Sequence, residues 1–596
     1  MPRRRWLLFA LLAVGEPCSI GKIMDICSST DVEPFLGSEE RCDRCVLQDA
    51  NSFRSTRGGD IQRLCLTSTV LEYTSGARTL FLHLEDVIGA KARPVTRSNR
   101  RGKGGGGGED DEKNQGGFHY QLEIFAYVPG AMDKEPGCAP SVGLCRRGKK
   151  KRNPAHQTWL VSDDETARKW ETAINDLLKA EQKNEADSSG EGSDAGCADA
   201  AVKGNPRGPG RRLLVLINPF SGTGKSRSTW QETLRPMLEQ AMASVKVMFS
   251  SRRGEFEELI KNAGDAITGG AGGEAGGGGG PGSSGDSTGL GSLDDFDGII
   301  VIGGDGTFFE VLQGMYARPD CARQLARLSL GIVPGGSGNG LAKTLSVESG
   351  EEFGVVSASF LAAKGATKPM DLLPTESGSK KYLAFLNVGW GMISDVDIES
   401  EAYRWMGSLR FTVGTVVRIV NLKYYRGRIS YLPDLQPGQN ATAMAPTPFH
   451  MPPLTDPVHM APGDGSDSAN TSGEEASAQR WTSVEGDFIL ADIAQTSHIA
   501  HDMPMAPHSR LGDGLMDLFF IKKGASRIEM MQMFLAMEKG EHISPRFPCI
   551  SWFRVRAFRI EPLTSNGRLT VDGELVDYAP LQQHVWHKAA NVFCSP

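Results

Sequence analysis

The stretch GIIVIGGDGT at residues 298–307 decides the fold. Its first part, Gly298 to Ile302, is a short apolar run typical of a buried strand, and a helical pattern through Val311 follows it. The glycine-rich turn between them therefore lies at the carboxyl end of a strand, which is the edge where α/β sheets bind ligands.

The same pattern of a strand followed by a turn or a helix recurs on both sides of this stretch. It is found at Leu213–Ile217 before Asn218-Pro219, at Lys246–Phe249, and at Leu330–Val333 before the glycine loop Gly335–Asn339. This repetition predicts an α/β nucleotide-binding domain over residues 211–365. The glycine tract 269–291 is a loop insertion within it.

The composition changes towards strands after Met370. Strand-like runs occur at Tyr382–Val388, Arg428–Leu432, Asp487–Ile493, Leu515–Ile521, Trp552–Ile560 and Leu569–Val571. We expect an antiparallel β-sandwich, a lipid-binding domain, over residues 366–596. Two helices, about Glu401–Tyr424 and Arg527–Lys539, interrupt it, and the Pro-, Ser- and Gly-rich insert 433–483 should be disordered.

The part of the chain before residue 211 divides into an extension (1–60), a strand-rich module (61–180) and a polar linker (181–210). The strand-like runs of the module are Leu64–Tyr73, Thr79–Ile88, His119–Tyr127 and Thr158–Val161. A helix at about Glu165–Leu178 follows, and the glycine-rich insert 102–117 interrupts the strands. This arrangement resembles a pleckstrin-homology-like β domain. Its basic run Arg146–Arg152 is either a solvated loop or a contact with anionic lipid.

Composition limits the classes of partner and the compartment. The net charge of −7 and the pI near 6.0 give no general attraction to nucleic acid. Eleven cysteines without regular spacing favour a reducing, cytoplasmic compartment. The start, Arg3–Val14, resembles a secretory signal without a clear cleavage site. Since no run of about 18 apolar residues occurs, we expect peripheral association with membranes.

The glycine loops are suited to phosphate because backbone amides can approach an anion closely where no Cβ intervenes. The segment Asn218–Lys225 ends like a P-loop, but Pro219 stands where that pattern requires glycine. The spacing of a dinucleotide-binding fingerprint is also absent.

Together, Asn218-Pro219…Gly222-Thr223-Gly224, Gly303–Thr307 and Pro334–Asn339 resemble the catalytic domain shared by diacylglycerol, ceramide and sphingosine kinases. Further segments are similar to sphingosine kinases in particular. They are Asp395–Ser400 with Arg404 and Arg410, Tyr425–Arg428, Phe534–Gly540, and Asp572-Gly573-Glu574.

The resemblance implies phosphorylation of the primary hydroxyl of a sphingoid base by ATP with Mg²⁺, with Asp305 accepting the hydroxyl proton. It implies ATP contacts at Asn218, Pro219, Phe220, Gly222, Ser250, Gly304, Glu310, Gly336, Ser337, Gly338, Arg404, Arg410, Asp572, Gly573 and Glu574. It implies substrate contacts at Asp397, Asn387 and His498, and no protein residue dedicated to a metal. Phe220 and Asn387 depart from the family, which commonly has a basic residue and a small hydroxyl residue at these positions.

The protonated amine of a sphingoid base calls for a carboxylate in the pocket, and Asp397 fits that role. The alternative is that Asp397 only caps a helix beginning near Glu399. An apolar slot for the lipid tail is expected among Phe385, Val388, Trp390, Met392, Phe411, Val416 and Ile419, although core packing explains many of these residues equally well.

Two other functions stay open at this point. One is a ceramide or diacylglycerol kinase of the same fold, and the other is an inactive lipid-binding scaffold. The sequence also leaves open a homodimer, the preferred chain length of the lipid, the membrane that is sampled and any regulatory phosphorylation.

Overall fold

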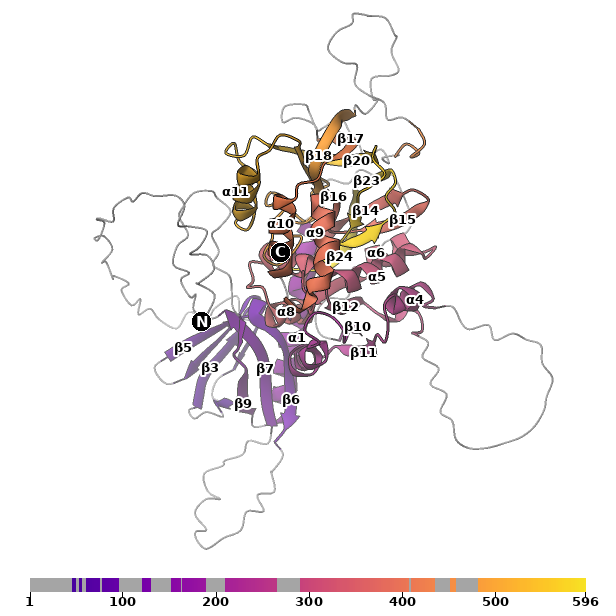
Figure 1. Cartoon of the computed structure of the whole chain (residues 1–596). Coiled ribbons are helices and arrows are strands. Elements are labelled where there is room, and N and C mark those ends of the chain that lie inside the picture. The colour runs from indigo at the N-terminus through magenta and orange to yellow at the C-terminus, as the bar shows by residue number, and fades with distance from the viewer. Residues whose placement is uncertain are drawn as a thin grey trace, which may run out of the picture. The chain divides into compact units, whose positions relative to one another are not determined.

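The computed structural model describes residues 46–49, 53–55, 60–75, 78–95, 120–129, 152–161, 163–188, 210–264, 290–406, 409–434, 451–456 and 481–595. The expected inserts 102–117 and 269–291 fall mostly or wholly outside these ranges, as does the start of the chain. Figure 1 shows the order of the described elements from the indigo N-terminal strands to the yellow C-terminal ones.

The N-terminal strands form an antiparallel sheet, in the order β5-β4-β3-β2-β9-β7-β6, with β1 beside β3 and β8 beside β7. The strands are β1 (Leu47–Asp49), β2 (Phe53–Ser55), β3 (Asp60–Leu66), β4 (Val70–Ser75), β5 (Arg78–His83), β6 (Val87–Pro94), β7 (Tyr120–Pro129), β8 (Arg152–Pro154) and β9 (Gln157–Val161), and the short helix η2 (Leu84–Asp86) precedes β6. Helix α1 (Asp164–Ser188) buries Trp170 and Ile174 against this sheet, as its predicted apolar face required.

One strand prediction in this sheet is wrong. The run Leu64–Tyr73 is not continuous, because Thr67 begins a turn in which its Oγ1 accepts the amide of Val70 at 3.0 Å. Threonine and serine favour such side-chain-to-backbone bonds, which compete with extended structure. The run therefore divides into β3 and β4.

The α/β part contains the predicted parallel strands in the order β11-β10-β12-β13. They are β10 (Arg212–Ile217), β11 (Ser244–Phe249), β12 (Gly298–Gly303) and β13 (Ser329–Pro334). The helices are α2 (Ser226–Thr229), η4 (Trp230–Leu234), α3 (Arg235–Gln240), α4 (Glu255–Lys261), η5 (Leu293–Asp295), α5 (Asp305–Tyr316), α6 (Cys321–Arg327), α7 (Gly340–Glu348) and α8 (Val355–Lys364). β12 is buried along its whole length, which explains its uninterrupted apolar sequence.

The remaining strands are mainly antiparallel and carry four helices. The strands are β14 (Thr367–Ser377), β15 (Lys380–Ala384), β16 (Asn387–Gly391), β17 (Tyr425–Pro433), β18 (Thr482–Ala494), β19 (Met516–Lys522), β20 (Ile550–Pro562), β21 (Leu569–Val571), β22 (Glu574–Val576), β23 (Leu581–His584) and β24 (Trp586–Phe593). The helices are α9 (Met392–Ser400), η6 (Glu401–Met406), α10 (Leu409–Val420) and α11 (Arg527–Met537).

Strand β24 joins the two parts of the fold. It pairs antiparallel with β14 and parallel with β13, so it extends the parallel sheet of the α/β part. The prediction that residues 366–596 form a separate second domain therefore needs correction at its last strand. The order of the strands in the sequence does not predict that β24 pairs with β13, because neighbouring parallel strands can come from distant parts of a chain.

Part of the insert expected to be disordered is held in place. Residues 451–456 lie against β20, where the buried side chain of Arg559 donates to the carbonyls of Pro453 at 2.9 Å and Asp456 at 2.5 Å. Met451 packs beside a small cluster that includes Trp481. A buried guanidinium requires acceptors, and these main-chain carbonyls supply them.

The N-terminal sheet contacts the α/β part through a buried group of ions. The guanidinium of Arg152 bonds Asp86 within its own sheet and bonds Glu351 across the boundary, with Nη2 2.7 Å from Oε1. It also lies over the ring of Phe360, 4.1 Å from the centroid. Arg152 therefore does not face a membrane as the basic-run hypothesis allowed, and residues 146–151 of that run lie outside the described part.

Two observations bear on membranes and cysteines. Within the ranges that the structure describes, no helix is long and apolar enough to cross a bilayer. Cys65 is disulfide-bonded, which differs from the expectation of reduced thiols throughout, whereas Cys321, Cys549 and Cys594 are free.

Candidate active site

A pocket of about 470 Å³ opens where the carboxyl ends of β10, β12 and β13 meet helices α9, α10 and α11. Glycine loops line it from the α/β part, and apolar side chains line it together with Asp397, Glu401 and Arg410 from α9, η6 and α10. Its lining comprises Asn218, Phe220–Gly222, Arg252, Arg253, Gly304–Thr307, Glu310, Gly336–Gly338, Leu386, Asn387, Met392, Ile393, Val396, Asp397, Glu401, Arg410, Phe411, Thr415, Ile499, Ala500, Asp502, Met503, Phe534 and Asp572–Glu574. It therefore brings together a site for phosphate and a site for an apolar group.

The glycine loops pack too closely for side chains. A Cβ on Gly336 would lie 2.5 Å from the Cα of Gly304, and a Cβ on Gly222 would collide with the carbonyl oxygen of Gly335. Gly222 also has a positive φ of 53°, which disfavours other residues. Asn218 ties the first loop to the second, because its Nδ2 donates to Thr307 Oγ1 at 3.0 Å. The result is a narrow surface of backbone suited to a polyphosphate.

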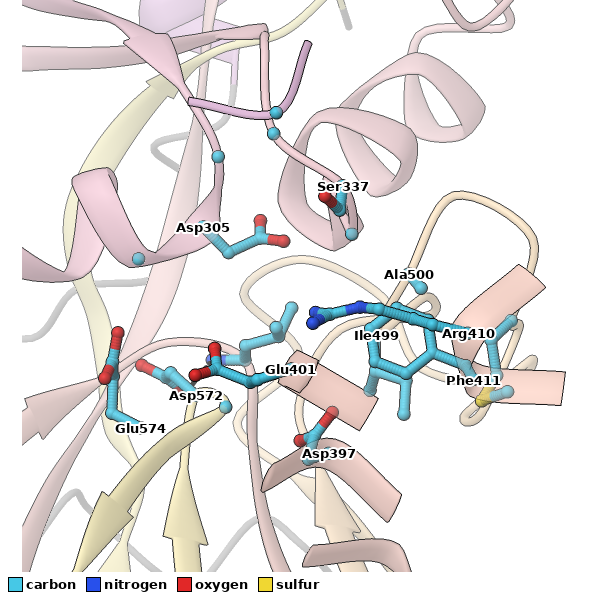
Figure 2. A pocket seen from close by; sticks show the side chains of 18 of the residues that line it. Asp305, Ser337, Asp397, Glu401, Arg410, Phe411, Ile499, Ala500, Asp572 and Glu574 are labelled. Carbon is cyan, nitrogen blue, oxygen red and sulfur yellow. Dashed lines mark hydrogen bonds between the residues drawn. The ribbon is translucent and has the colours of Figure 1, made fainter. Parts of the chain in front are cut away.

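Asp305 is the first residue of α5 and lies among these loops. Its carboxylate accepts the amides of Gly340 at 2.8 Å and Leu341 at 3.1 Å, which begin α7. Burial raises the pKa of this carboxyl group, and these amide bonds oppose the rise. Figure 2 shows the carboxylate pointing into the pocket. Its orientation is thus fixed before any substrate binds.

Asp397 lines the pocket from α9, on the apolar side. Burial raises its pKa to about 7, while the positive charge of Arg410 opposes the rise. Figure 2 shows Arg410 extending from α10 into the same pocket. Because α9 begins at Met392, Asp397 lies inside the helix, so the alternative that it caps a helix near Glu399 is wrong.

The neighbouring acid, Asp395, has a different environment. Its carboxylate accepts from the hydroxyl of Tyr425 and from Arg568 Nη1 at 3.0 Å, and Arg418 lies 3.4 Å away. These partners hold α9 against the strands. Of the two acids in the Asp395-Val396-Asp397 motif, only Asp397 lines the pocket.

The Asp572-Gly573-Glu574 turn closes the other side of the pocket. Asp572 accepts the amides of Phe385 at 3.0 Å, Leu386 at 2.9 Å and Asn387 at 3.0 Å, and so holds the start of β16 in place. Glu574 forms an ion pair with Arg253 from the loop before α4. The turn therefore connects the two halves of the site.

Most of the predicted site residues meet in this pocket. Pro219, Ser250 and His498 are the exceptions, since none of them lines it. Ser250 is buried at the end of β11. The main chain of His498 contacts Thr344, and it is the following residues, Ile499 and Ala500, that reach the pocket. The side chain of Arg404 lies outside what the structure describes.

Only two of the seven residues expected to form an apolar slot line the pocket. Met392 and Phe411 line the pocket, whereas Phe385, Val388 and Trp390 are fully buried in the main core. Of the two others, Ile419 is buried in another cluster and Val416 is exposed. The apolar end of the pocket is instead completed by Ile393, Val396, Ile499, Met503 and Phe534.

Sequence reasoning missed several polar residues of the site. Arg252 and Arg253 follow the end of β11, and position at a strand end could have identified them as it identified the glycine loops. No comparable signal marks Glu401 or Asp502.

Among the residues that the structure describes, no group of three His, Cys, Asp or Glu side chains could hold a metal ion. Mg²⁺ is commonly bound by one or two carboxylates together with substrate phosphates. Asp305 and Glu310 lie in the half of the pocket that also contains the glycine loops. Their oxygens fit an ion that arrives with a nucleotide.

Comparison with known proteins gives two family models. The diacylglycerol kinase catalytic domain matches residues 212–279 and 286–374, and the YegS C-terminal NAD kinase beta sandwich-like domain matches residues 476–594. The two matched regions contain β10 to β13 and β18 to β24, respectively.

Curated relatives extend the similarity across the site. The chain is 33% identical over 386 residues to sphingosine kinase 1 of Rattus norvegicus, covering 63% of this chain and 88% of that protein. It is 30% identical over 486 residues to sphingosine kinase 2 of Homo sapiens, covering 63% and 70%. It is 26% identical over 401 residues to sphingoid long chain base kinase 4 of Schizosaccharomyces pombe, covering 66% and 78%.

Proposed function

Because the chain belongs to the sphingosine kinase family and is a lipid kinase, we propose that it phosphorylates the primary hydroxyl of sphingosine and related sphingoid bases. The products are sphingosine 1-phosphate and ADP. One observation carries this proposal: the carboxylates of Asp305 and Asp397 line the same pocket, one beside the glycine loops and the other beside apolar side chains.

The two carboxylates perform different tasks in this proposal. Asp305 accepts the proton of the primary hydroxyl as its oxygen bonds to the γ-phosphorus and the bond from phosphorus to the β,γ-bridging oxygen breaks. Asp397 pairs with the protonated amine on the neighbouring carbon. Diacylglycerol lacks that amine and would leave the carboxylate without a partner, which disfavours its binding.

The charged groups at the rim support binding of the nucleotide. The glycine-loop amides hold the phosphates, and Arg410 supplies a fixed positive charge near them. Mg²⁺, when bound with ATP, neutralises part of the phosphate charge, and the carboxylate oxygens of Asp305 and Glu310 are suited to contact it.

For the N-terminal sheet with its closing helix α1, we propose a pleckstrin-homology-like module. Its antiparallel strands and the Trp170-bearing helix after them support this assignment. We further propose that the protein works in the cytoplasm with peripheral association to membranes, because its proposed substrate partitions into bilayers.

Transfer of labelled γ-phosphate from ATP·Mg²⁺ to sphingosine, ceramide and diacylglycerol in detergent micelles tests the proposal. We expect label in sphingosine. Asp305→Asn should lower kcat by about 10²–10⁴-fold because the proton acceptor is lost. Asp397→Ala should lower kcat/KM for sphingosine by about 10²-fold, because a desolvated charge loses its partner.

Asp176→Asn on the exposed face of α1 is the matched control and should retain full activity, since the Asp176 side chain is 62% exposed and remote in sequence from the pocket residues. Label in ceramide or diacylglycerol instead of sphingosine would refute the substrate assignment. If the folded wild-type protein labels none of the three lipids, the inactive-scaffold alternative is the better interpretation.

A further inference from the structure

A buried acid that the proposed reaction does not use lies behind the pocket. Asp492 is in β18 within the apolar run Phe488–Ala494, and it is fully buried. Its Oδ1 accepts from Asn387 Nδ2 at 2.7 Å. Its Oδ2 has no hydrogen-bond partner among the described residues. Burial raises the pKa of Asp492 to about 8, and the nearby charge of Asp397 acts in the same direction.

A carboxyl group buried at this position destabilises the fold, so we expect it to have a role in the site. Placing a carboxyl group in an apolar environment with incomplete hydrogen bonding costs about 1–3 kcal/mol or more. An aliphatic residue would satisfy the core of β18 equally well. The bond to Asn387 is the only hydrogen bond that the Asp492 side chain makes in the described structure.

Asn387 is held rigidly and reaches the pocket. Its main-chain amide donates to Asp572 Oδ1 at 3.0 Å, and its carbonyl accepts the amide of Asp572 at 2.8 Å. Asn387 is among the residues that line the pocket, while Asp492 is not. Both main-chain polar groups of Asn387 are bonded to Asp572, and one Nδ2 hydrogen is bonded to Asp492. Oδ1 is therefore the acceptor that the Asn387 side chain can offer to the pocket.

We propose that Asp492 is a positioning residue that fixes the Asn387 amide with its oxygen towards the pocket, where it accepts a hydrogen bond from the secondary hydroxyl of a sphingoid base. This inference rests on the proposed function. Asp397 takes the ammonium group, and Asn387 takes the hydroxyl on the adjacent carbon. The pocket thus recognises two donor groups beside the reacting hydroxyl.

The chemistry of an amide explains why a second residue is needed. An asparagine side chain can rotate to present either a donor or an acceptor, and the two orientations fill the same volume. Oδ1 of Asp492 accepts from Nδ2 whether the acid is charged or protonated. A bond from a fixed neighbour therefore selects the acceptor orientation and prevents the NH₂ group from facing the ligand.

Steady-state kinetics with two lipids test this inference. One is sphinganine, and the other is 2-aminooctadecan-1-ol, which keeps the amine and the primary hydroxyl but lacks the secondary hydroxyl. Asp492→Leu should raise KM for sphinganine about 10-fold, the equivalent of one hydrogen bond, and leave kcat and the KM for ATP nearly unchanged. With 2-aminooctadecan-1-ol, KM should change less than about 2-fold.

Two further variants separate positioning from packing. In an Asn387→Ala background, Asp492→Leu should have no additional effect on KM for sphinganine, because Asp492 acts through Asn387. Asp492→Asn keeps an acceptor oxygen and should recover most of the loss. Asp492→Leu should fold, since replacing a buried acid by an apolar residue of similar size is tolerated.

The outcomes are distinguishable. Equal losses with both lipids, or a full additional loss in the Asn387→Ala background, would overturn the positioning role while leaving the proposed function intact. If wild-type protein phosphorylates neither base, the proposed function fails, and this inference fails with it.

Discussion

Replacing Arg152 by alanine should loosen the contact between the N-terminal sheet and the α/β part. The guanidinium is nearly buried, with its side chain 4% exposed, and it bonds Asp86, Glu351 and the carbonyl of Tyr127. Its removal leaves two buried carboxylates without their cation, a defect of about 3–5 kcal/mol. Since 1.4 kcal/mol is a factor of ten, local opening should become roughly 10²–10³·⁵-fold more frequent.

Hydrogen–deuterium exchange of the β7 and β8 amides measures this opening without requiring the whole chain to unfold in one step. Arg168→Ala is the matched control, because its ion pair with Asp164 joins side chains that are 65% and 41% exposed. A pair this exposed to solvent contributes little to stability.

A triple replacement separates charge from packing. Changing Arg152 to Met together with Asp86 and Glu351 to Leu removes all three charges and should restore most of the protection, because apolar residues often replace buried ion groups without loss. Exchange in Arg152→Ala no faster than in Arg168→Ala would refute the reasoning.

Three other changes have defined outcomes. Lowering the pH through about 7 should reduce kcat/KM for sphingosine. Burial raises the pKa of Asp397 to about 7, so its charged form predominates only above that pH. Only the charged form pairs with an ammonium group. The pH–rate profile of Asp397→Asn should lack this acidic limb, and an unchanged profile would contradict the assignment. Gly336→Ala should weaken ATP binding in calorimetry by at least about 10-fold, because its Cβ would lie 2.5 Å from the Cα of Gly304. The control Gly354→Ala should bind ATP normally, because nothing lies within 4 Å of its Cβ. Asp572→Ala should lower the melting temperature markedly in thermal denaturation, because it leaves three buried amides without an acceptor, at a cost of about 1–3 kcal/mol each. A shift of less than about 2 °C would argue against the role of Asp572 in holding the start of β16.

The glycine-loop side of the pocket could be predicted because its determinants are local. Gly304, Asp305 and Gly336 each follow a short apolar strand, and parallel strands bring such ends together at one edge. The same reasoning could not give the apolar lining of the pocket. Whether Val388 or Ile393 faces the pocket depends on how α9 packs on the sheet, which no sequence period reveals.

The sequence also could not predict the long-range ionic contacts. Arg152 stands at the end of a basic run, and its acidic partners are 66 and 199 residues away in the chain. Asp492 left a detectable signal, since it is the one acid within the otherwise apolar run Phe488–Ala494 of β18. Such an acid indicates a buried polar contact, but only the structure identifies Asn387 as its partner.

The return of β24 to the edge of β13 has a consequence for biosynthesis. About 250 residues separate the two strands, so at roughly 5–20 residues per second the nascent α/β domain exposes an unpaired strand edge for about 12–50 s. An exposed edge of apolar residues is prone to pairing with other chains. During that interval the ribosome-bound chain presents a target for chaperones. The α/β domain cannot complete its sheet until β24, the last strand of the β-sandwich, has been made.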